Sequence, residues 1–199
     1  MIGRLVLPAL LLVVTACSAL PLPPAPTSSP AAPPCPEAGV EITALSGEAA
    51  MGLRVLTLEM RNCGSGTQRF RGYPDVRLLD EDGQPLDVRV EHGSASISPI
   101  ASFEVPAAEF ALGPGDRATA GIVWRNTYDD TTNPPQVGAE IDIAPLAGLP
   151  RQVFTPRLDP DGGTPSPNSP ATTIDLGSTG RIGLSPWSAA EGPGDRPRP

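Results

Sequence analysis

Apolar and polar residues alternate through most of the chain from Val40 onward. In the segment 56–60, two leucines and a methionine share one face of an extended chain, and Thr57 and Glu59 occupy the other. Such period-two alternation is typical of β-strands that bury one face. The same pattern predicts strands that contain Val40, Ile42 and Ala44; Leu56, Leu58 and Met60; Val76 and Leu78; Leu86, Val88 and Val90; Phe103 and Val105; Phe110 and Leu112; Ala118, Ala120, Ile122 and Trp124; Ile141 and Ile143; Ile174 and Leu176; Ile182 and Leu184.

These segments are short, and turns rich in glycine, proline and aspartate separate them. No stretch repeats apolar residues at intervals of three and four, so no long helix is predicted. The pair Asp82-Gly83, between two alternating runs, is a strong β-hairpin signal. The pattern therefore favours an all-β fold, an immunoglobulin-like antiparallel β-sandwich, with a closed barrel as the alternative.

The first residues are organised like a bacterial lipoprotein signal. Arg4 precedes the apolar run 5–14, and two small residues then lead to Cys17. A run of about ten residues is too short to span the roughly 30 Å hydrocarbon core of a membrane. We therefore expect residues 1–16 to be a removed signal peptide and Cys17 to be lipidated, which would anchor the protein at the extracytoplasmic face of the cell membrane. The alternative is an ordinary secretory signal in which Cys17 is incidental.

Proline content divides the rest of the chain. Residues 17–34 combine the lipidated cysteine with an uncharged stretch that holds seven prolines. At about 3.1 Å per residue this stalk would reach roughly 50 Å from the membrane. One β domain is predicted for residues 35–190, with a surface loop at 159–171, and residues 191–199 are predicted to be a disordered tail.

The other two cysteines are Cys35 and Cys63. In an oxidising compartment they would be the only thiols left once Cys17 is lipidated, so we expect them to form a disulfide. A thiol metal site is the rival interpretation, but two cysteines and the single His92 do not complete a four-coordinate cage.

The chain is acidic, with a formal net charge of −8, and all 14 of its basic residues are arginine. This balance argues against a nucleic-acid partner, which needs a basic surface. The absence of lysine excludes Schiff-base chemistry. No cofactor is expected.

Several short motifs are specific as a set. They are Asn62-Cys63-Gly64, Gly72-Tyr73-Pro74, Leu78-Leu79-Asp80 with Asp82-Gly83, Leu112-Gly113-Pro114-Gly115, Trp124-Arg125-Asn126, Ile174-Asp175-Leu176-Gly177 and the segment from Arg181 to Trp187. Together they resemble a bacterial domain of unknown function, number 4232, whose members are commonly actinobacterial secreted proteins and lipoproteins. The resemblance spans most of the chain from Cys35 to Trp187, and it implies a β-rich extracytoplasmic domain and no catalytic residues.

Candidate chemistry is sparse. His92 stands beside Gly93 and Ser94, but the glycine-flanked serine of a hydrolase elbow is missing, so no catalytic residue is predicted. The acidic pairs and triplets at 80–82, 129–130 and 159–161 lack the spacing of a calcium loop and are expected to be turn carboxylates, with no metal bound.

Three aromatic residues could belong to either a binding surface or the core. Tyr73, in the Gly-Tyr-Pro unit, is expected to be a turn residue whose ring packs against the sandwich. Trp124 is in phase with Ile122 and is expected in the core, whereas the sequence leaves Trp187 undecided.

Together these features predict a membrane-anchored extracytoplasmic lipoprotein that acts as a non-enzymatic interaction or ligand-binding module of the cell envelope. Its partners would be the membrane, through the lipid on Cys17, and an envelope protein or glycan. The alternatives are a structural or accessory envelope protein without a small ligand and, last, a hydrolase of envelope polymers. The ligand-binding residues are not identifiable from the sequence.

Overall fold

The structure is a computed structural model that describes residues 34–132 and 134–190, and it is all-β. The predicted signal peptide, Cys17, most of the stalk and the tail lie outside the described residues. The strands are β1 (Val40–Ala50), β2 (Leu53–Asn62), β3 (Gln68–Phe70), β4 (Asp75–Leu79), β5 (Arg89–His92), β6 (Phe110–Leu112), β7 (Arg117–Arg125), β8 (Val137–Gly138), β9 (Glu140–Ala144), β10 (Gln152–Phe154), β11 (Ile174–Asp175), β12 (Arg181–Leu184) and β13 (Ser188–Ala189), with one 3-10 turn, η1 (Ala101–Phe103).

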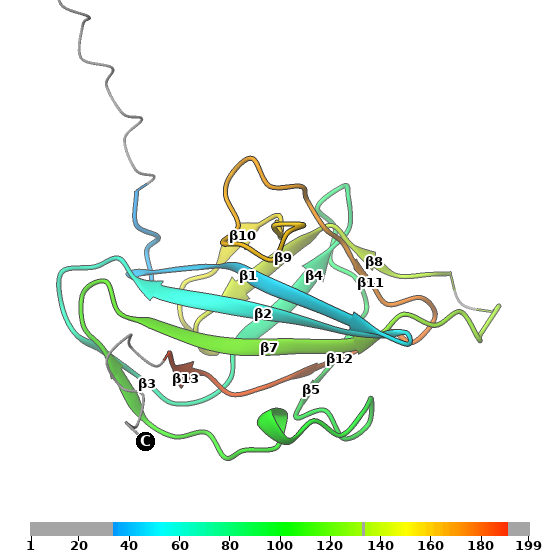
Figure 1. The fold of residues 1–199 in the computed structure, drawn as a ribbon, viewed down its shortest axis with the longest axis horizontal. Helices are drawn as coiled ribbons and strands as arrows, with labels where there is room; N and C mark the ends of the chain where they lie inside the picture. Colours follow the sequence, from blue (N-terminus) through cyan, green and yellow to red (C-terminus); the bar gives the residue numbers. More distant parts are fainter. Residues whose placement is uncertain (1–33, 133, 191–199) are drawn as a thin grey trace, which may run out of the picture. The chain divides into compact units, whose positions relative to one another are not determined.

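Two sheets form a sandwich. The larger has the order β1-β2-β7-β12-β5, and β13 also pairs with β7. All its pairs are antiparallel except β12–β5, which is parallel. The smaller sheet has the antiparallel order β10-β9-β4 and lies behind the long strands in Figure 1. Two short ladders, β11–β8 and β3–β6, complete the described part.

The all-β sandwich is confirmed, and each sheet of the described part keeps two edges, so the alternative of a closed barrel is wrong. The finer, immunoglobulin-like assignment stays a prediction. In the immunoglobulin fold, strands A, B and E are neighbours in one sheet and strands G, F and C are neighbours in the other. The neighbours β1-β2-β7 and β10-β9-β4 have the same order along the chain. The parallel pair β12–β5 is not part of the immunoglobulin arrangement.

The core lies between the two sheets. The alternating residues of β2 that were predicted to face inward, Leu56, Leu58 and Met60, are buried and stand opposite residues of β7 in the ladder. Side chains of β4 and β9 join the same cluster. The core and the disulfide both lie within the compact unit of residues 34–199, so we expect this unit to fold on its own.

Local turn chemistry explains the longest hairpin. The turn between β1 and β2 holds Met51 at φ 47° and Gly52 at φ 80°. Two consecutive positive φ angles match the twist of paired strands, which is why such turns join long hairpins. The ladder runs from Ala50↔Leu53 back to Val40↔Asn62.

The structure corrects two predictions of local structure. The predicted turn at Asp82-Gly83 forms, but the chain after it pairs antiparallel with β4 only at the bridge Leu79↔Pro85, and β5 then pairs with β12 in the larger sheet. Alternation identifies the apolar face of a strand but not its partner. No strand forms around Phe103 and Val105: Phe103 is buried at the end of the turn η1, and Val105 follows this turn and is exposed.

Candidate functional site

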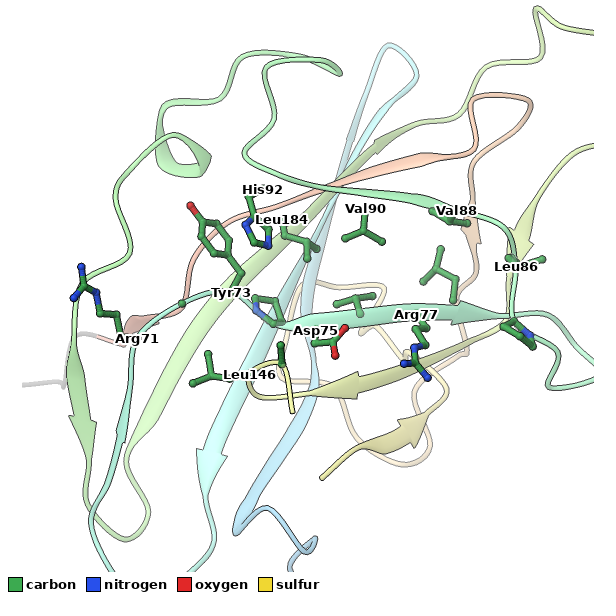
Figure 2. Close-up of a pocket in the computed structure, with 16 residues that line it drawn as sticks. Arg71, Tyr73, Asp75, Arg77, Leu86, Val88, Val90, His92, Leu146 and Leu184 are labelled. Atoms are coloured by element: carbon green, nitrogen blue, oxygen red, sulfur yellow. The ribbon is translucent and has the colours of Figure 1, made fainter. Parts of the chain in front are cut away.

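An apolar groove lies between β4 and β5, where both sheets end on the same side of the sandwich (Figure 2). The larger sheet has five strands in its main order, and the facing sheet has three. The smaller sheet therefore does not cover the inner face of β5. Val90, in phase with a run that predicted a buried face, is 40% exposed.

The groove has a volume of about 750 Å³. This is within the range of small-molecule and peptide sites, which are mostly apolar clefts with a few polar groups. Figure 2 shows Leu86, Val88 and Val90 in a row along one side of the groove and the strand β4 along the other. The apolar lining includes Val76, Leu78, Leu86, Val88, Val90, Leu146 and Leu184.

Two contacts close the ends of the groove. At one end the amide of Leu86 donates a hydrogen bond to the carbonyl of Leu78 at 2.9 Å. At the other, the rings of Tyr73 and His92 stack with centroids 3.9 Å apart and planes within 4°. Because Tyr73 precedes β4 and His92 ends β5, this stack joins the two sheets. Tyr73 is half-buried and its ring packs against the core, as predicted, and it also lines the groove.

The charges at the groove are mainly positive. Arg71 and Arg77 line it and are exposed. Asp75, the one carboxylate of the lining, is paired with Arg151, whose Nη1 lies 2.7 Å from its Oδ2. Arg71 donates its Nε–H to the carbonyl of Ala107 at 3.3 Å, and Nη1 of Arg77 lies 3.9 Å from Asp142 Oδ2. Both side chains stay exposed, so the groove presents two arginines to an anionic group on a chain that is acidic overall.

His92 lies at the groove but without catalytic partners among the described residues. Its ring contact is Tyr73, and it makes no hydrogen bond to an acid or a hydroxyl in residues 34–132 or 134–190. The nearby hydroxyl of Ser94 donates to Glu104 at 2.9 Å and accepts the amide of Ile100. Ser94 is therefore a structural residue of its loop.

Glu104 holds that loop in place. Its Oε1 accepts the amide of Ser94 at 2.7 Å as well as the hydroxyl. The backbone hydrogen bond from Ser94, followed by the side-chain hydrogen bond, lowers the pKa of Glu104 below its ordinary value of 4.5. Hydrogen bonds to a carboxylate favour its charged form, so the loop is held most firmly when Glu104 is ionised.

The predicted disulfide is present. Cys35 and Cys63 are bonded, with their Cα atoms 5.6 Å apart. Cys63 follows β2 and Cys35 precedes β1, so the bond lies just beyond the terminal pair Val40↔Asn62 and clamps that end of the hairpin.

The predicted turn carboxylates are confirmed in all three acidic segments. Asp80 Oδ1 accepts the amides of Asp82 and Gln84, and Asp159 Oδ1 accepts the amide two residues later. In the third segment, Asp130 accepts the amide of residue 132. Across the described ranges, no group of three histidine, cysteine or acidic side chains is placed to hold a metal ion.

Both tryptophans are core residues. Trp124, predicted there, is 6% exposed, and its indole N–H donates to the carbonyl of Asp175 at 2.9 Å. Trp187 is more deeply buried and donates to the carbonyl of Pro145 at 2.7 Å. Its own amide bonds to the carbonyl of Gly72, so Trp187 supports the turn that carries Tyr73.

A second polar cluster joins β11 to the loop after β7. Tyr128 donates its hydroxyl to the carboxylate of Asp175, which also accepts the amide of Gly177. Desolvation, the largest influence on Asp175, raises its pKa, but hydrogen bonds led by that from Tyr128 outweigh it and the pKa is lowered. The same hydrogen bond raises the pKa of Tyr128. The cluster holds the loop after β7 against β11, and the carboxylate of Asp175 and the hydroxyl of Tyr128 are both hydrogen-bonded within it.

The comparison with protein families identifies the β domain. The family described as "Domain of unknown function (DUF4232)" matches residues 35–187, which is most of the chain. The chain belongs to this family. No curated protein and no solved structure matches it. Among the residues that the structure describes, no helix is long and apolar enough to cross a membrane.

For this DUF4232 domain, the groove is the feature that sequence reasoning missed. The alternation of Leu86, Val88 and Val90 was visible, but it predicted burial. Arg71 and Arg77 flank the Gly-Tyr-Pro unit closely in the sequence, and this clustering of arginines was the one available signal.

Proposed function

We propose that this protein is a bacterial lipoprotein of actinobacterial type that serves as a non-enzymatic ligand-binding module of the cell envelope. Lipid on Cys17 would hold it at the extracytoplasmic face of the cell membrane, and the groove between β4 and β5 would be its ligand site.

The observation that carries the proposal is the uncovered inner face of β5. Burying one valine side chain fully contributes about 1.5–3 kcal/mol, a large share of the stability of a typical domain. Val88 and Val90 line the groove, yet Val90 is 40% exposed. Apolar surface left open between polar rims commonly marks a binding site.

The polar groups around the groove support binding over catalysis. The ring of His92 stacks on Tyr73, and Ser94, two residues further along the chain, donates its hydroxyl to Glu104 within its own loop. A hydrolase needs a nucleophile, a base and an orienting acid that converge on one point. Arg71 and Arg77 instead suit recognition of an anionic group on an apolar ligand.

The anchor rests on the sequence alone, on the apolar run 5–14 followed by Cys17. Two or three acyl chains would make attachment to the membrane effectively permanent. A tethered domain would then hold its groove within reach of envelope molecules.

The proposal is tested with 1-anilinonaphthalene-8-sulfonate, an apolar dye with one anionic group, added to residues 34–199. We expect the dye fluorescence to saturate, and we expect Val90→Arg to lower the affinity for the dye at least tenfold. Val153→Arg is the matched control, because Val153 is 53% exposed on β10, away from the groove. Equal binding by both variants, or no saturable binding by the parent, would refute the groove as a ligand site.

A further inference from the structure

Both strands that border the groove have unpaired backbone edges. β4 pairs with β9 on one side, and backbone groups alternate sides along a strand. The carbonyl of Leu79 accepts a hydrogen bond from the amide of Ala139, next to β9, whereas the carbonyl of Leu78 accepts one from the amide of Leu86 on the opposite side. The even-numbered residues of β4 therefore direct their backbone groups away from β9, toward the groove. The amide and carbonyl of Val76 face this side, and no hydrogen bond to them occurs in the described part of the chain.

β5 has the same property. The amides of Arg89 and Gly93 donate to the carbonyls of Gly180 and Leu184, each at 2.8 Å, on the β12 side. The backbone groups of Val90 and His92 therefore face away from β12. The groove thus combines an apolar lining with unpaired backbone groups of Val76 on β4 and of Val90 and His92 on β5, whereas the far end of β4 is paired with residues 84–86.

From this combination, and resting on the function proposed above, we propose that the ligand is an extended polypeptide segment of a partner protein, with apolar side chains at alternate positions and an acidic residue. It lies along β4 as an added strand. It extends the smaller sheet from three strands to four and covers Val90 of β5 and Val88, which directly precedes that strand.

The unpaired edges discriminate between ligand classes. Val76 is 3% exposed, and its backbone groups have no hydrogen-bond partner in the described part of the chain. An acyl chain could fill the apolar groove, but it would leave these groups unsatisfied, and buried unsatisfied polar groups are costly. A peptide strand satisfies them, as in other cases of strand addition to an open sheet edge. Its alternate side chains also match the two-residue period of Val88 and Val90.

Charge and length agree with such a segment. Arg77 is exposed and lies 3.9 Å from Asp142, at the limit of an ion pair, so it is available to a carboxylate of the ligand. Arg71 marks the other end of the groove (Figure 2). From Tyr73 to Leu78 an extended chain advances about 17 Å, at about 3.3 Å per residue, which accommodates roughly five residues of a bound strand.

The test uses residues 34–199 and a fluorescein-labelled, terminally blocked peptide, Thr-Val-Glu-Val-Thr-Val-Thr, followed by fluorescence polarisation. We expect saturable binding that Val90→Arg weakens at least tenfold and Val153→Arg leaves unchanged. A peptide methylated on alternate backbone nitrogens, along the edge that would face β4, should bind at least tenfold more weakly than the parent peptide, because it cannot donate to the strand.

A charge exchange tests the acidic residue. Arg77→Glu should lower the affinity for the parent peptide at least fivefold and raise the affinity for a peptide with lysine in place of glutamate. Arg69→Glu is the matched control, because Arg69 is an exposed arginine on β3 outside the groove. Equal effects of the two substitutions would overturn the assignment of the acidic residue to Arg77.

Other occupants would give different results. Saturable binding of laurate or of the naphthalene dye, lost in Val90→Arg, together with no binding of the peptides, would overturn the peptide proposal and leave the groove a binding site. Self-association in sedimentation equilibrium that Val90→Arg abolishes would overturn it in favour of a second copy of the chain. No saturable binding of any probe would overturn both this proposal and the proposed function.

Discussion

The Cys35–Cys63 disulfide should provide a large share of the stability of the domain. We consider its removal by the double substitution Cys35→Ser and Cys63→Ser. The bond spans 28 residues of sequence and closes the end of the β1–β2 hairpin. In the chain-entropy treatment, a closed loop of this size stabilises the folded state by about 3.6 kcal/mol at 25 °C, through loss of freedom in the unfolded chain.

Urea unfolding of residues 34–199 measures this contribution directly. We expect the free energy of unfolding to fall by about 3–4 kcal/mol and the midpoint of thermal unfolding to fall by roughly 7–14 °C. The urea dependence of that free energy should increase, because the unlinked unfolded chain exposes more surface. Cys35 is exposed, so mild reduction of the parent domain should reproduce the loss and serves as the control. A loss below 1 kcal/mol would refute the argument that the bond acts on the unfolded chain.

Three further predictions concern a core residue, a loop and the anchor. Trp187→Phe removes the donor to the Pro145 carbonyl and should cost about 2–4 kcal/mol in urea unfolding, and a loss under 1 kcal/mol would contradict the role given to this hydrogen bond. Glu104→Gln should lower the thermal midpoint at neutral pH. Because the pKa of Glu104 is lowered in the folded state, its stabilisation is present above pH 4.5 and is lost as the pH falls through the lowered pKa, so the two proteins should converge in acid; a gap that does not change with pH would argue against this. Cys17→Ala should abolish incorporation of a labelled fatty acid in the producing cells, and persistent labelling would disprove acylation at this residue.

The sequence predicted the elements that depend on local pattern. The buried face of β2 follows from its alternation, and the disulfide follows from the count of cysteines. Partner strands were not predictable, because alternation does not reveal that β5 pairs with β12 in parallel. For the same reason the sequence could not show that the smaller sheet stops at β4 and leaves Val90 uncovered.

The groove also depends on contacts between distant segments. The whole of β4 and most of β5 lie between Tyr73 and His92 in the sequence, and their rings stack because the two sheets end together. The apolar side chain of Phe103 predicted a strand, but Phe103 lies in a 3-10 turn and is buried there. Its ring packs so closely on Gly121 that a Cβ atom at position 121 would lie 2.5 Å from the ring. Such packing is a property of the assembled fold.

The proposed peptide site requires that the Val76 edge of β4 is unpaired in the free protein and receives a strand from the ligand. Amide hydrogen exchange of residues 34–199, with and without the parent peptide, tests it most directly. We predict that the amides of Val76 and Val90 exchange rapidly in the free domain, whereas those of Arg89 and Gly93 are protected. Saturating peptide should slow the exchange of the Val76 amide at least tenfold. Protection of Val76 in the free domain, or exchange at Val76 that the bound peptide leaves unchanged, would contradict the account.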